Sequence, residues 1–488
     1  MKKIILTIFV GLSIAAGAMA QQSFRSTYFM EGYNLRHQFN PAFAAQSSYF
    51  TFGVGDSGLS TSSNIGVNNF LFPYNGQLTT FMSSSVSADD FLGSLSTSNR
   101  LNLSMDKNLF SIGIWGSNAF YSFDMNFKTS ADLRVPYSLF DFMKSAGSQQ
   151  IYDISDLSAR INSRLEFAFG YSRQISDIVN VGARVKFLVG LAGMNMNIDN
   201  MVVRMNEDKW SIDSKGKMEV SGKFMDIQTK GETGADIDEP SDRNMVDFGD
   251  GINVKENLGV GDFINGFGAA IDLGAEAEII PGLRVSLAVN DLGFMSWRNT
   301  TVAETSGKGW TFDGFTDVSF DGSKDNSLSE QFGDLVDDMS SMLDFERTKF
   351  GASSISMLAA TINLGVEYVM PFYTGLTAGL LSSTRVNGCY TSTEGRVFAN
   401  LKPTDWFSFG LNYGLSTFGS TMGCAIGFHT RGFSCFFGTD SIAFNWAKAT
   451  KEGLLYPYKK LNVGMNFGIS FNLGMRHDTA PRRSIIQL

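Results

Sequence analysis

Cysteine, histidine and proline are scarce in this chain, and each shortage excludes a class of protein. Only 3 Cys, 3 His and 9 Pro occur among 488 residues. Three scattered cysteines are too few, and odd in number, for a disulfide framework. No Cys-x-x-Cys or His-Glu-x-x-His spacing is present, so we expect no metal centre and no other cofactor. We find no Ser/His/Asp set either, so the sequence does not indicate an enzyme.

Charge and long apolar runs are scarce as well. Charged residues make up 18% of the chain, against about 25% in an average protein. The balance of 39 Lys and Arg against 48 Asp and Glu gives a net charge of −9, which disfavours a nucleic-acid partner. Beyond residue 20 no apolar run is long enough to predict a membrane-spanning helix. Glycine (51 copies) and phenylalanine (43 copies) are abundant instead.

Residues 1–20 have the order of a secretory signal peptide. Lys2 and Lys3 precede an apolar run from Ile4 to Ala16, and Ala18-Met19-Ala20 has the small-x-small pattern of a cleavage site. The apolar run is too short to cross a bilayer. We therefore expect Sec-type export followed by signal cleavage.

The strongest pattern in the mature chain is strict alternation. From Leu461 to Met475 every second residue is apolar, and the residues between them are Asn, Gly or Ser. Fifteen alternating residues far exceed a typical strand of about 5–6 residues, and such a strand is long enough to cross a bilayer at a tilt. The same alternation recurs at residues 407–415 and 165–171.

The polar face of these strands is small and nearly uncharged, whereas the wet face of a soluble sheet is normally charged. A membrane barrel inverts the usual arrangement, with apolar residues facing lipid and small polar residues facing the lumen. Lipid also demands a closed sheet, because an open edge leaves backbone groups unpaired. We predict an all-β, transmembrane antiparallel β-barrel of about 14 strands (12–16) over residues 48–476, in the bacterial outer membrane, with a periplasmic tail at 477–488. An exported soluble β-protein is the alternative.

Charged residues within the candidate strands fall on the polar face. We expect them to line the lumen, either as paired charges in a packed interior or as a selectivity constriction. The candidate lumen charges are Asp124, Glu166, Arg184, Lys186, Asp272, Glu276, Arg284 and Glu367.

Connections alternate between short turns, expected at the periplasm, and long loops, expected outside the cell. The long loops are expected near 199–262, 299–355 and 440–458. Eleven strands are predicted from residue 165 onward, and three or five upstream strands give a total of 14 or 16. The upstream candidates lie near 48–55, 77–87, 100–106, 110–116 and 119–128. A tight turn at His429-Thr430 would place Cys424 opposite Cys435, where we expect free thiols rather than a disulfide.

Two further segments lack strand alternation. The acidic residues Asp236, Asp238, Glu239 and Asp242 indicate a solvated loop, with calcium binding as the alternative. Spacing from Phe332 to Leu343 predicts a short helix at the barrel mouth.

The segment 21–47 is rich in aromatic residues and precedes the first strand. We expect its part from Phe24 to Phe43 to fold into the lumen as a plug, with Arg25 and Arg36 paired to lumen carboxylates. The candidate carboxylates are Glu166, Asp272, Glu276 and Glu367. A periplasmic tail is the alternative. The candidate plug residues are Arg25, Arg36, Asn40 and Pro41.

Several short motifs resemble those of known barrels. Asn40-Pro41-Ala42 and the stretch from Phe169-Gly170-Tyr171 to Asn180-Val181-Gly182 resemble elements of the long-chain fatty-acid transporter superfamily. Asn290-Asp291-Leu292-Gly293 is similar to a unit of type IX secretion barrels. Over nearly its whole length the chain resembles an uncharacterised outer-membrane barrel family of Bacteroidota, a domain of unknown function. The superfamily implies fourteen strands, an N-terminal hatch and a hydrophobic substrate.

Two function classes follow. The first is a channel or transporter for small hydrophobic or amphipathic solutes. The alternative is a non-transporting barrel that acts as a scaffold or partner of a secretion or surface-assembly system. The expected partners are the lipid bilayer, with a hydrophobic small molecule or other envelope proteins as further candidates.

Overall fold

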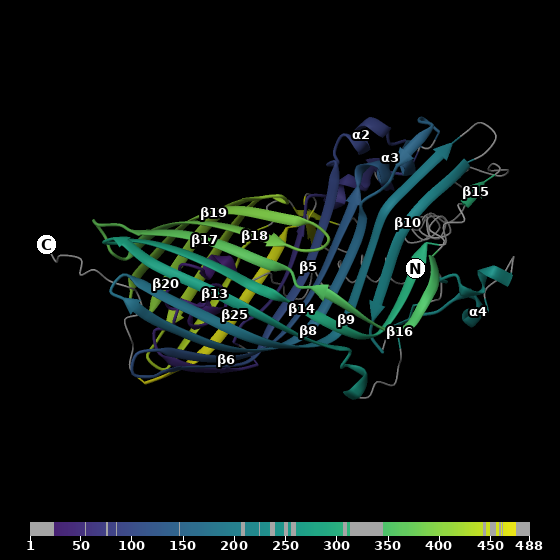
Figure 1. Ribbon diagram of the computed structural model, residues 1–488. Helices are drawn as coiled ribbons and strands as arrows, with labels where there is room; N and C mark the ends of the chain where they lie inside the picture. Colours follow the sequence, from purple (N-terminus) through teal and green to yellow (C-terminus); the bar gives the residue numbers. More distant parts are fainter. Residues whose placement is uncertain are drawn as a thin grey trace.

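The computed structural model is a closed antiparallel barrel of 14 strands (Figure 1). It describes residues 24–53, 55–74, 77–83, 85–145, 147–205, 210–223, 225–234, 240–247, 252–254, 260–305, 310–312, 345–442, 446–448, 455–457, 460 and 462–474.

The barrel strands follow one another in chain order, each antiparallel to the last. β1 (Ser48–Phe52) and β2 (Ser57–Ser63) together form the first strand of the wall, and β25 (Val463–Leu473) pairs with both and closes the barrel. The strands between are β5 (Ser98–Trp115), β6 (Phe120–Pro136), β8 (Leu157–Ser176), β9 (Val179–Met205), β13 (Gly266–Ile280), β14 (Leu283–Thr305), β17 (Ala360–Val369), β18 (Leu376–Val386), β19 (Thr391–Thr404), β20 (Phe407–Ser416), β21 (Gly419–His429) and β22 (Phe433–Thr439).

The prediction of a barrel is confirmed, and the strand count is resolved at fourteen rather than sixteen. The upstream candidates 100–106 and 110–116 belong to one strand, β5, which continues through a register shift between Asn108 and Phe110. The candidate 77–87 is wrong as a barrel strand. Its residues Gln77–Thr80 form β4, which pairs with β3 (Leu71–Tyr74) in a separate hairpin.

The first strand of the wall is interrupted between β1 and β2, but hydrogen bonds on both sides of the interruption hold it to β5. Gly53 N donates to Leu109 O at 2.7 Å, and Asn108 N donates to Asp56 O at 2.7 Å. A Cβ on Gly55 would lie 2.1 Å from Asn108 Oδ1, so this position has no room for a side chain. The interruption therefore depends on glycine, and it turns the Asp56 carboxylate toward the Tyr33 hydroxyl inside the barrel.

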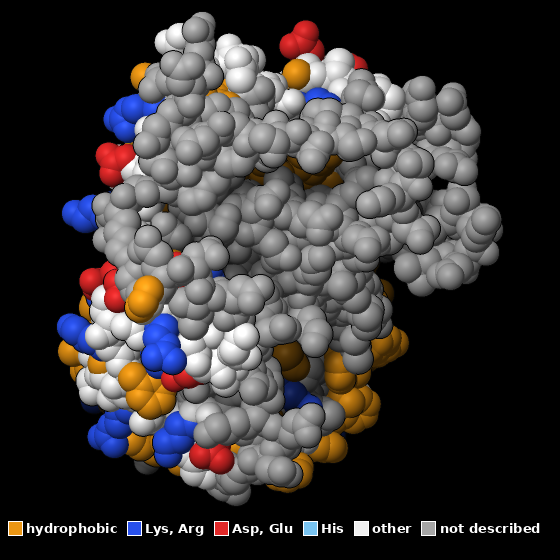
Figure 2. Space-filling model, turned by 90° about the vertical axis from the view of Figure 1, so that its right-hand side faces the viewer, with side chains coloured by type: hydrophobic (Ala, Val, Ile, Leu, Met, Phe, Trp, Pro, Cys, Tyr) orange, Lys and Arg blue, Asp and Glu red, His pale blue; other side chains and the backbone are white. Residues whose placement is uncertain are grey.

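The barrel is apolar outside and polar inside. Large hydrophobic side chains are exposed on the outer face of successive strands, among them Phe169 at 61%, Leu287 at 50% and Phe437 at 52% exposure. Hydrophobic side chains form the lower right rim of the molecule in Figure 2. Asn, Ser and charged side chains of the alternate positions are buried. None of the described helices is long and apolar enough to cross a membrane.

The two ends of the barrel differ (Figure 1). At the short-turn end, neighbouring strands are joined by tight connections such as 177–178 and 281–282. At the opposite end, which we call the long-loop end, several strands continue past the barrel. Further helices and strands lie between them in the chain. These are η3 (Val67–Asn69), α2 (Ala88–Leu92), α3 (Tyr137–Ser145), β7 (Ile151–Asp153), β10 (Trp210–Ser221), β11 (Met225–Ile227), α4 (Lys230–Thr233), η4 (Pro240–Asn244), β12 (Ile252–Val254), η5 (Val260–Asp262), β15 (Trp310–Phe312), β16 (Phe345–Met357), β23 (Trp446–Lys448) and β24 (Leu455–Pro457).

Part of the expected loops is ordered sheet, which we call the lobe: β7, β10, β16 and the distal halves of β9 and β14. β10 pairs with β9 and with β14, and a hydrophobic core that includes Ile198, Val203 and Phe345 lies beneath it. Loops were expected to begin at residues 199 and 299. Both predictions are wrong, because β9 continues to Met205 and β14 continues to Thr305. Two connections at this end, 387–390 and 417–418, are also short.

The predicted helix from Phe332 to Leu343 lies outside the described residues, as do Asp236, Asp238 and Glu239, while Asp242 lies in η4. Among the residues that the structure describes, no cluster of three or more His, Cys, Asp or Glu could hold a metal ion.

The predicted juxtaposition of two cysteines is wrong. Cys424 lies opposite Thr439, and Cys435 lies opposite Phe428. The reason is that β21 continues to His429 and the turn follows at residues 430–432, further along the chain than predicted. All three cysteines are free, as expected. The third, Cys389, lies in a turn at the long-loop end, where burial raises the pKa of its thiol to about 11.

The apolar belt on the outer face predicts how strongly a charged side chain destabilises the barrel at different depths along β8. We expect Phe169→Arg to destabilise the barrel in phospholipid vesicles by about 2–4 kcal/mol, because this side chain lies well inside the belt. Ile175→Arg is the matched control on the same face and strand, beside the short-turn end, with an expected cost of about 0–1 kcal/mol. The native Arg173 is already exposed on that face. Urea unfolding, followed by heat-modified mobility on gels, measures both. Equal costs would contradict a lipid-facing belt.

Candidate functional site

The segment 24–47 lies inside the barrel and contacts its wall on several sides (Figure 1). It forms two 3-10 turns, η1 (Arg25–Thr27) and η2 (Asn34–Gln38). The Tyr28 hydroxyl lies 3.1 Å from Ser286 Oγ on β14, and Asn34 Nδ2 donates to Ser470 Oγ on β25 at 2.8 Å. Asn40 Nδ2 donates to Ala275 O on β13 at 3.2 Å. We call this segment the plug.

Aromatic side chains fill the centre of the plug and pack against the wall. Tyr33 meets Phe436 of β22 with ring centroids 4.5 Å apart, and Phe29 meets Phe398 of β19 at 5.1 Å. The plug and the inner face of the barrel thus share one hydrophobic core, which is a single connected cluster of buried side chains. Its buried aromatic side chains are Phe24, Tyr28, Phe29, Tyr33, Phe39 and Phe43.

The Asn40-Pro41-Ala42 motif is a tight turn pressed against the wall. Asn40 Oδ1 accepts a hydrogen bond from Ala42 N at 2.9 Å, which is the local bond that favours asparagine in turns. A Cβ on Gly274 would lie 2.0 Å from Asn40 Oδ1, and one on Gly182 would lie 2.1 Å from Pro41 O. Glycine at these two wall positions therefore makes room for the turn.

The two plug arginines make their closest contacts with groups other than the predicted carboxylates. Arg25 pairs with Glu394 of β19. Arg36 donates through Nε to Tyr28 O at 2.9 Å, and its guanidinium lies 4.4 Å from the centre of the Phe43 ring. Arg36 thus holds the plug to itself, whereas Arg25 holds it to the wall.

Three hydrogen bonds to a single carboxylate fix the start of the plug. Asp440, just beyond β22, accepts from Arg25 N at 2.8 Å and from Ser26 N at 2.7 Å. The Ser26 hydroxyl also donates to this carboxylate. Because Asp440 follows the long-loop end of β22, Arg25 and Ser26 lie on the long-loop side of the plug.

The structure places all eight predicted lumen charges on the inner face, buried, in two groups. The first contains Asp124, Glu166, Arg184, Lys186 and Asp272. Arg184 bridges Asp124 at 2.7 Å and Asp272 at 2.9 Å, and Lys186 lies 2.8 Å from Asp272.

The plug joins both groups of lumen charges. His37 Nε2 lies 3.0 Å from Asp124 in the first group. In the second group, Arg284 pairs with Glu367 at 2.9 Å and with Glu31 of the plug at 2.8 Å, and lies 3.9 Å from Glu276. The lumen is therefore a packed network of paired charges around the plug.

Several lumen residues were missed by the sequence analysis although they share the same parity. Glu394 and Arg396 alternate with outward residues along β19, and Arg385 pairs with Asp132 across the lumen at 2.9 Å. Asp291 lies 2.6 Å from Lys186. The alternation along β6 and β19 could have identified Asp132, Glu394 and Arg396 as lumen residues. Asp291, with a φ of +59°, lies at a strand irregularity that breaks the alternation.

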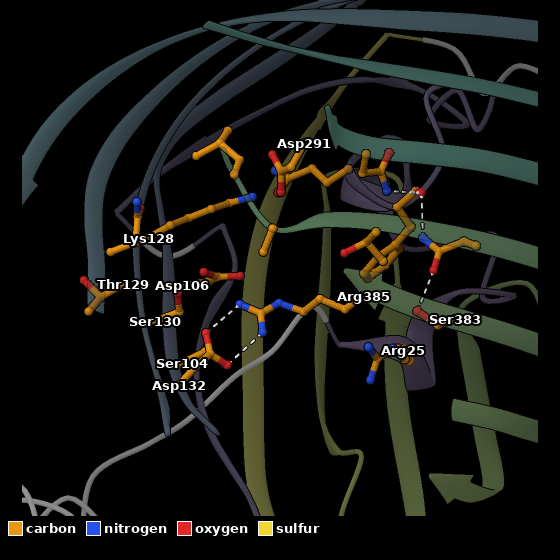
Figure 3. Close-up of a pocket in the computed structure, with 18 of the residues that line it drawn as sticks. Arg25, Ser104, Asp106, Lys128, Thr129, Ser130, Asp132, Asp291, Ser383 and Arg385 are labelled. Carbon is orange, nitrogen blue, oxygen red and sulfur yellow. Dashed lines mark hydrogen bonds and ion pairs between the residues drawn. The ribbon is translucent and has the colours of Figure 1, made fainter. Parts of the chain in front are cut away.

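Cavities lie on both sides of the plug. A cavity of about 100 Å³ on the long-loop side is lined by Tyr28, Gln38 and Phe39 of the plug together with wall residues (Figure 3). On the short-turn side, a cavity of about 590 Å³ is lined by plug residues 29–32, and another of about 890 Å³ by Gly32 and Asn34. The same short segment thus separates the cavities of the two ends.

His429, expected in a turn, is instead the last residue of β21. Its Nε2 lies 2.7 Å from Ser408 Oγ on the neighbouring strand, and its ring packs over Gly32 of the plug.

The buried network predicts a large cost for removing its central cation. Arg184→Gln leaves the carboxylates of Asp124 and Asp272 buried with less compensation, and we expect a loss of about 3–5 kcal/mol in the free energy of unfolding. Arg134→Gln is the control, because Arg134 pairs with Asp156 at 2.9 Å in an exposed position, where about 0–1 kcal/mol is expected. Urea titration of both variants in detergent compares them. A loss for Arg184→Gln no larger than for the control would contradict the network.

No curated protein matches the chain. Among solved structures, the toluene transporter TodX of P. putida is similar with a TM-score of 0.40 and 7% identity, over 91% of this chain and 95% of that one. The Ralstonia pickettii toluene transporter TbuX gives 0.37 and 8%, over 91% and 94%. A Pseudomonas aeruginosa FadL homologue gives 0.38 and 10%, over 93% and 99%.

A family model matches residues 41–440, which is most of the 488-residue chain. The protein therefore belongs to DUF5723, a family of unknown function.

Proposed function

We propose that this protein is an outer-membrane channel for small solutes, whose lumen the plug closes and whose opening requires the plug to move. One observation carries the proposal: residues of the same plug line the cavities of both ends. A solute that passes from one end to the other has to displace this segment. The wall around the plug carries many buried polar and charged side chains, which suit a path for a polar solute once the plug has moved.

The proposed outer-membrane location rests on the apolar belt and on the signal-like sequence pattern of residues 1–20. A sheet with exposed Phe, Leu and Val on its outer face is stable only where that face meets lipid or another apolar surface. Barrel closure leaves no unpaired edge in such a wall. We assign the short-turn end to the periplasm and the long-loop end to the cell exterior, as in other bacterial barrels.

The sequence favours a hydrophobic or an amphipathic solute, and the lining supports a solute with polar groups. The cavity on the long-loop side is lined mainly by charged, hydroxyl and amide side chains, with Leu358 and Leu381 among the few apolar ones. A purely hydrophobic solute would strip water from these groups without replacing their hydrogen bonds, which is costly.

The lobe favours a second candidate, a barrel that serves as a scaffold or partner in secretion or surface assembly. Its sheet extends past the barrel and has a hydrophobic core of its own, with Ile154, Ile198 and Val203 fully buried. A packed projection of this kind is suited to binding another envelope protein.

Removing the plug separates the two candidates. We expect deletion of residues 24–43 to raise single-channel conductance in planar bilayers, because the cavities of the two ends then join. The deletion variant has to retain heat-modified mobility, which shows that the barrel is closed. A correctly assembled deletion variant with no added conductance would contradict the channel and favour the scaffold.

A milder variant tests the anchor of the plug. Asp440→Asn weakens the charge-assisted bonds to Arg25 N and Ser26 N, which are worth about 1.5–3 kcal/mol each when a charge is involved. We expect the open population to rise by about tenfold or more. Asp405→Asn is the control, since Asp405 is 91% exposed and lies 3.7 Å from Lys402. Equal channel activity in the two variants would show that the anchor does not hold the plug.

A further inference from the structure

Three neighbouring strands present a compact grid of polar side chains to the cavity on the long-loop side. Each row of the grid consists of directly opposed residues on β5, β6 and β8. The rows are Asp106–Lys128–Arg164, Ser104–Ser130–Asn162 and Asn102–Asp132–Arg160. All but Asn102 line the same cavity, and several are labelled in Figure 3. The grid is therefore one continuous surface rather than a scatter of charges.

Two cations of this grid oppose each other directly. Lys128 of β6 is the register partner of Arg164 of β8, and both side chains line the cavity. Like charges at directly opposed positions of a sheet destabilise it. Glu166 offsets this repulsion only in part, since its Oε2 lies 3.5 Å from Lys128 Nζ and 4.0 Å from Arg164 Nη2. Neither distance is that of a charge-assisted hydrogen bond.

Arg164 has hydrogen-bonding capacity to spare. The residue is 8% exposed, and its Nε is buried with no hydrogen-bond partner among the described residues. Its Nη1 donates to Asn162 Oδ1 at 3.0 Å, and its other carboxylate, Asp291, lies 3.7 Å away. A buried guanidinium N–H without an acceptor is costly, so the described protein groups do not satisfy this cation completely.

Arg160 adds a third cation, which forms no ion pair with any residue that the structure describes. It is 9% exposed, and its Nη2 donates to the backbone oxygen of Met357 rather than to a carboxylate. Asp132, its register partner, is instead occupied by Arg385, which contacts both carboxylate oxygens at 2.9 and 3.1 Å (Figure 3). The acid that faces Arg160 in the grid is thus already neutralised from across the lumen.

We propose that this grid binds a small oxyanion, such as a phosphate or a short carboxylate, between Lys128 and Arg164 with Arg160 beside them. Lys128 and Arg164, whose nearest carboxylate oxygens lie 3.5 Å and 3.7 Å away, attract the charge. Ser130 and Asn162 in the middle row offer uncharged donors to its oxygens. A cavity of about 100 Å³ holds a solute of a few heavy atoms and has no room for a long acyl chain. The ligand class is therefore a compact hydrophilic anion. The inference goes beyond the proposed channel, because binding occurs with the plug in place.

Calorimetric titration of the full chain in an uncharged maltoside detergent tests the site. The probes are inorganic phosphate, acetate and dodecanoate, with choline chloride to hold ionic strength constant. We expect saturable binding of phosphate or acetate by the unaltered protein, weakened about tenfold by Arg164→Gln or Lys128→Gln. Arg164→Lys keeps the charge and should retain most of the affinity. Lys402→Gln, which removes a cation at the short-turn end, should leave binding unchanged.

The result for the unaltered protein decides the proposal even if a variant fails to assemble. Absence of saturable binding of both phosphate and acetate overturns it. Saturable binding of dodecanoate alone also overturns it, because the ligand would then be an acyl chain rather than a small oxyanion. Equal weakening by Lys402→Gln and Arg164→Gln would show that net charge, and not the grid, attracts the anion. Because conductance is not measured, failure of this test leaves the channel proposal to its own experiment.

Discussion

Charge compensation inside the barrel is the constraint on which the rest of this structure depends. A wall that is apolar outside has to turn its polar residues inward, and a buried ion without a partner costs several kcal/mol. Arg184 meets this constraint by bridging Asp124 and Asp272, and Arg284 meets it by pairing with Glu367. The plug takes part in the same compensation, since His37 contacts Asp124 and Glu31 contacts Arg284. Removing the plug would take one partner from each of the two groups of lumen charges. The wall and the plug therefore stabilise each other.

Space inside the wall is the second requirement, and glycine supplies it. Gly182 and Gly274 lie where any side chain would collide with Pro41 or Asn40, and Gly379 lies against the ring of Phe29. The abundance of glycine on the polar face thus reflects close packing of an inserted chain rather than an empty pore. The side chains on the polar face are small because the plug packs against them as a second layer. The aromatic side chains of the plug bury their surface there.

The sequence was sufficient to predict the barrel, because alternation along a single strand decides which face each residue occupies. For example, Phe169 and Glu166 were assigned to opposite faces, and the structure exposes the first and buries the second. Pairing between elements was harder to predict. The partner of Arg25 is Glu394, which lies 369 positions away, and nothing local distinguishes it from other lumen acids. The predicted opposition of Cys424 and Cys435 was wrong for a related reason, because a turn that lies further along the chain shifts every pair of the hairpin and gives Cys424 the partner Thr439. The lobe was missed because β10 lies in a segment whose charge composition resembles a loop.

Hydrogen exchange of the plug amides tests the central claim that residues 24–47 are seated in the lumen. Backbone N–H groups of Thr27, Tyr28, Met30 and Phe39 donate within the plug, and the surrounding side chains are buried. The account predicts that peptides from residues 24–43 exchange orders of magnitude more slowly than an unstructured chain, in the assembled barrel at neutral pH. Exchange of these peptides at the rate of an unstructured chain, in a barrel that retains its heat-modified mobility, would contradict it.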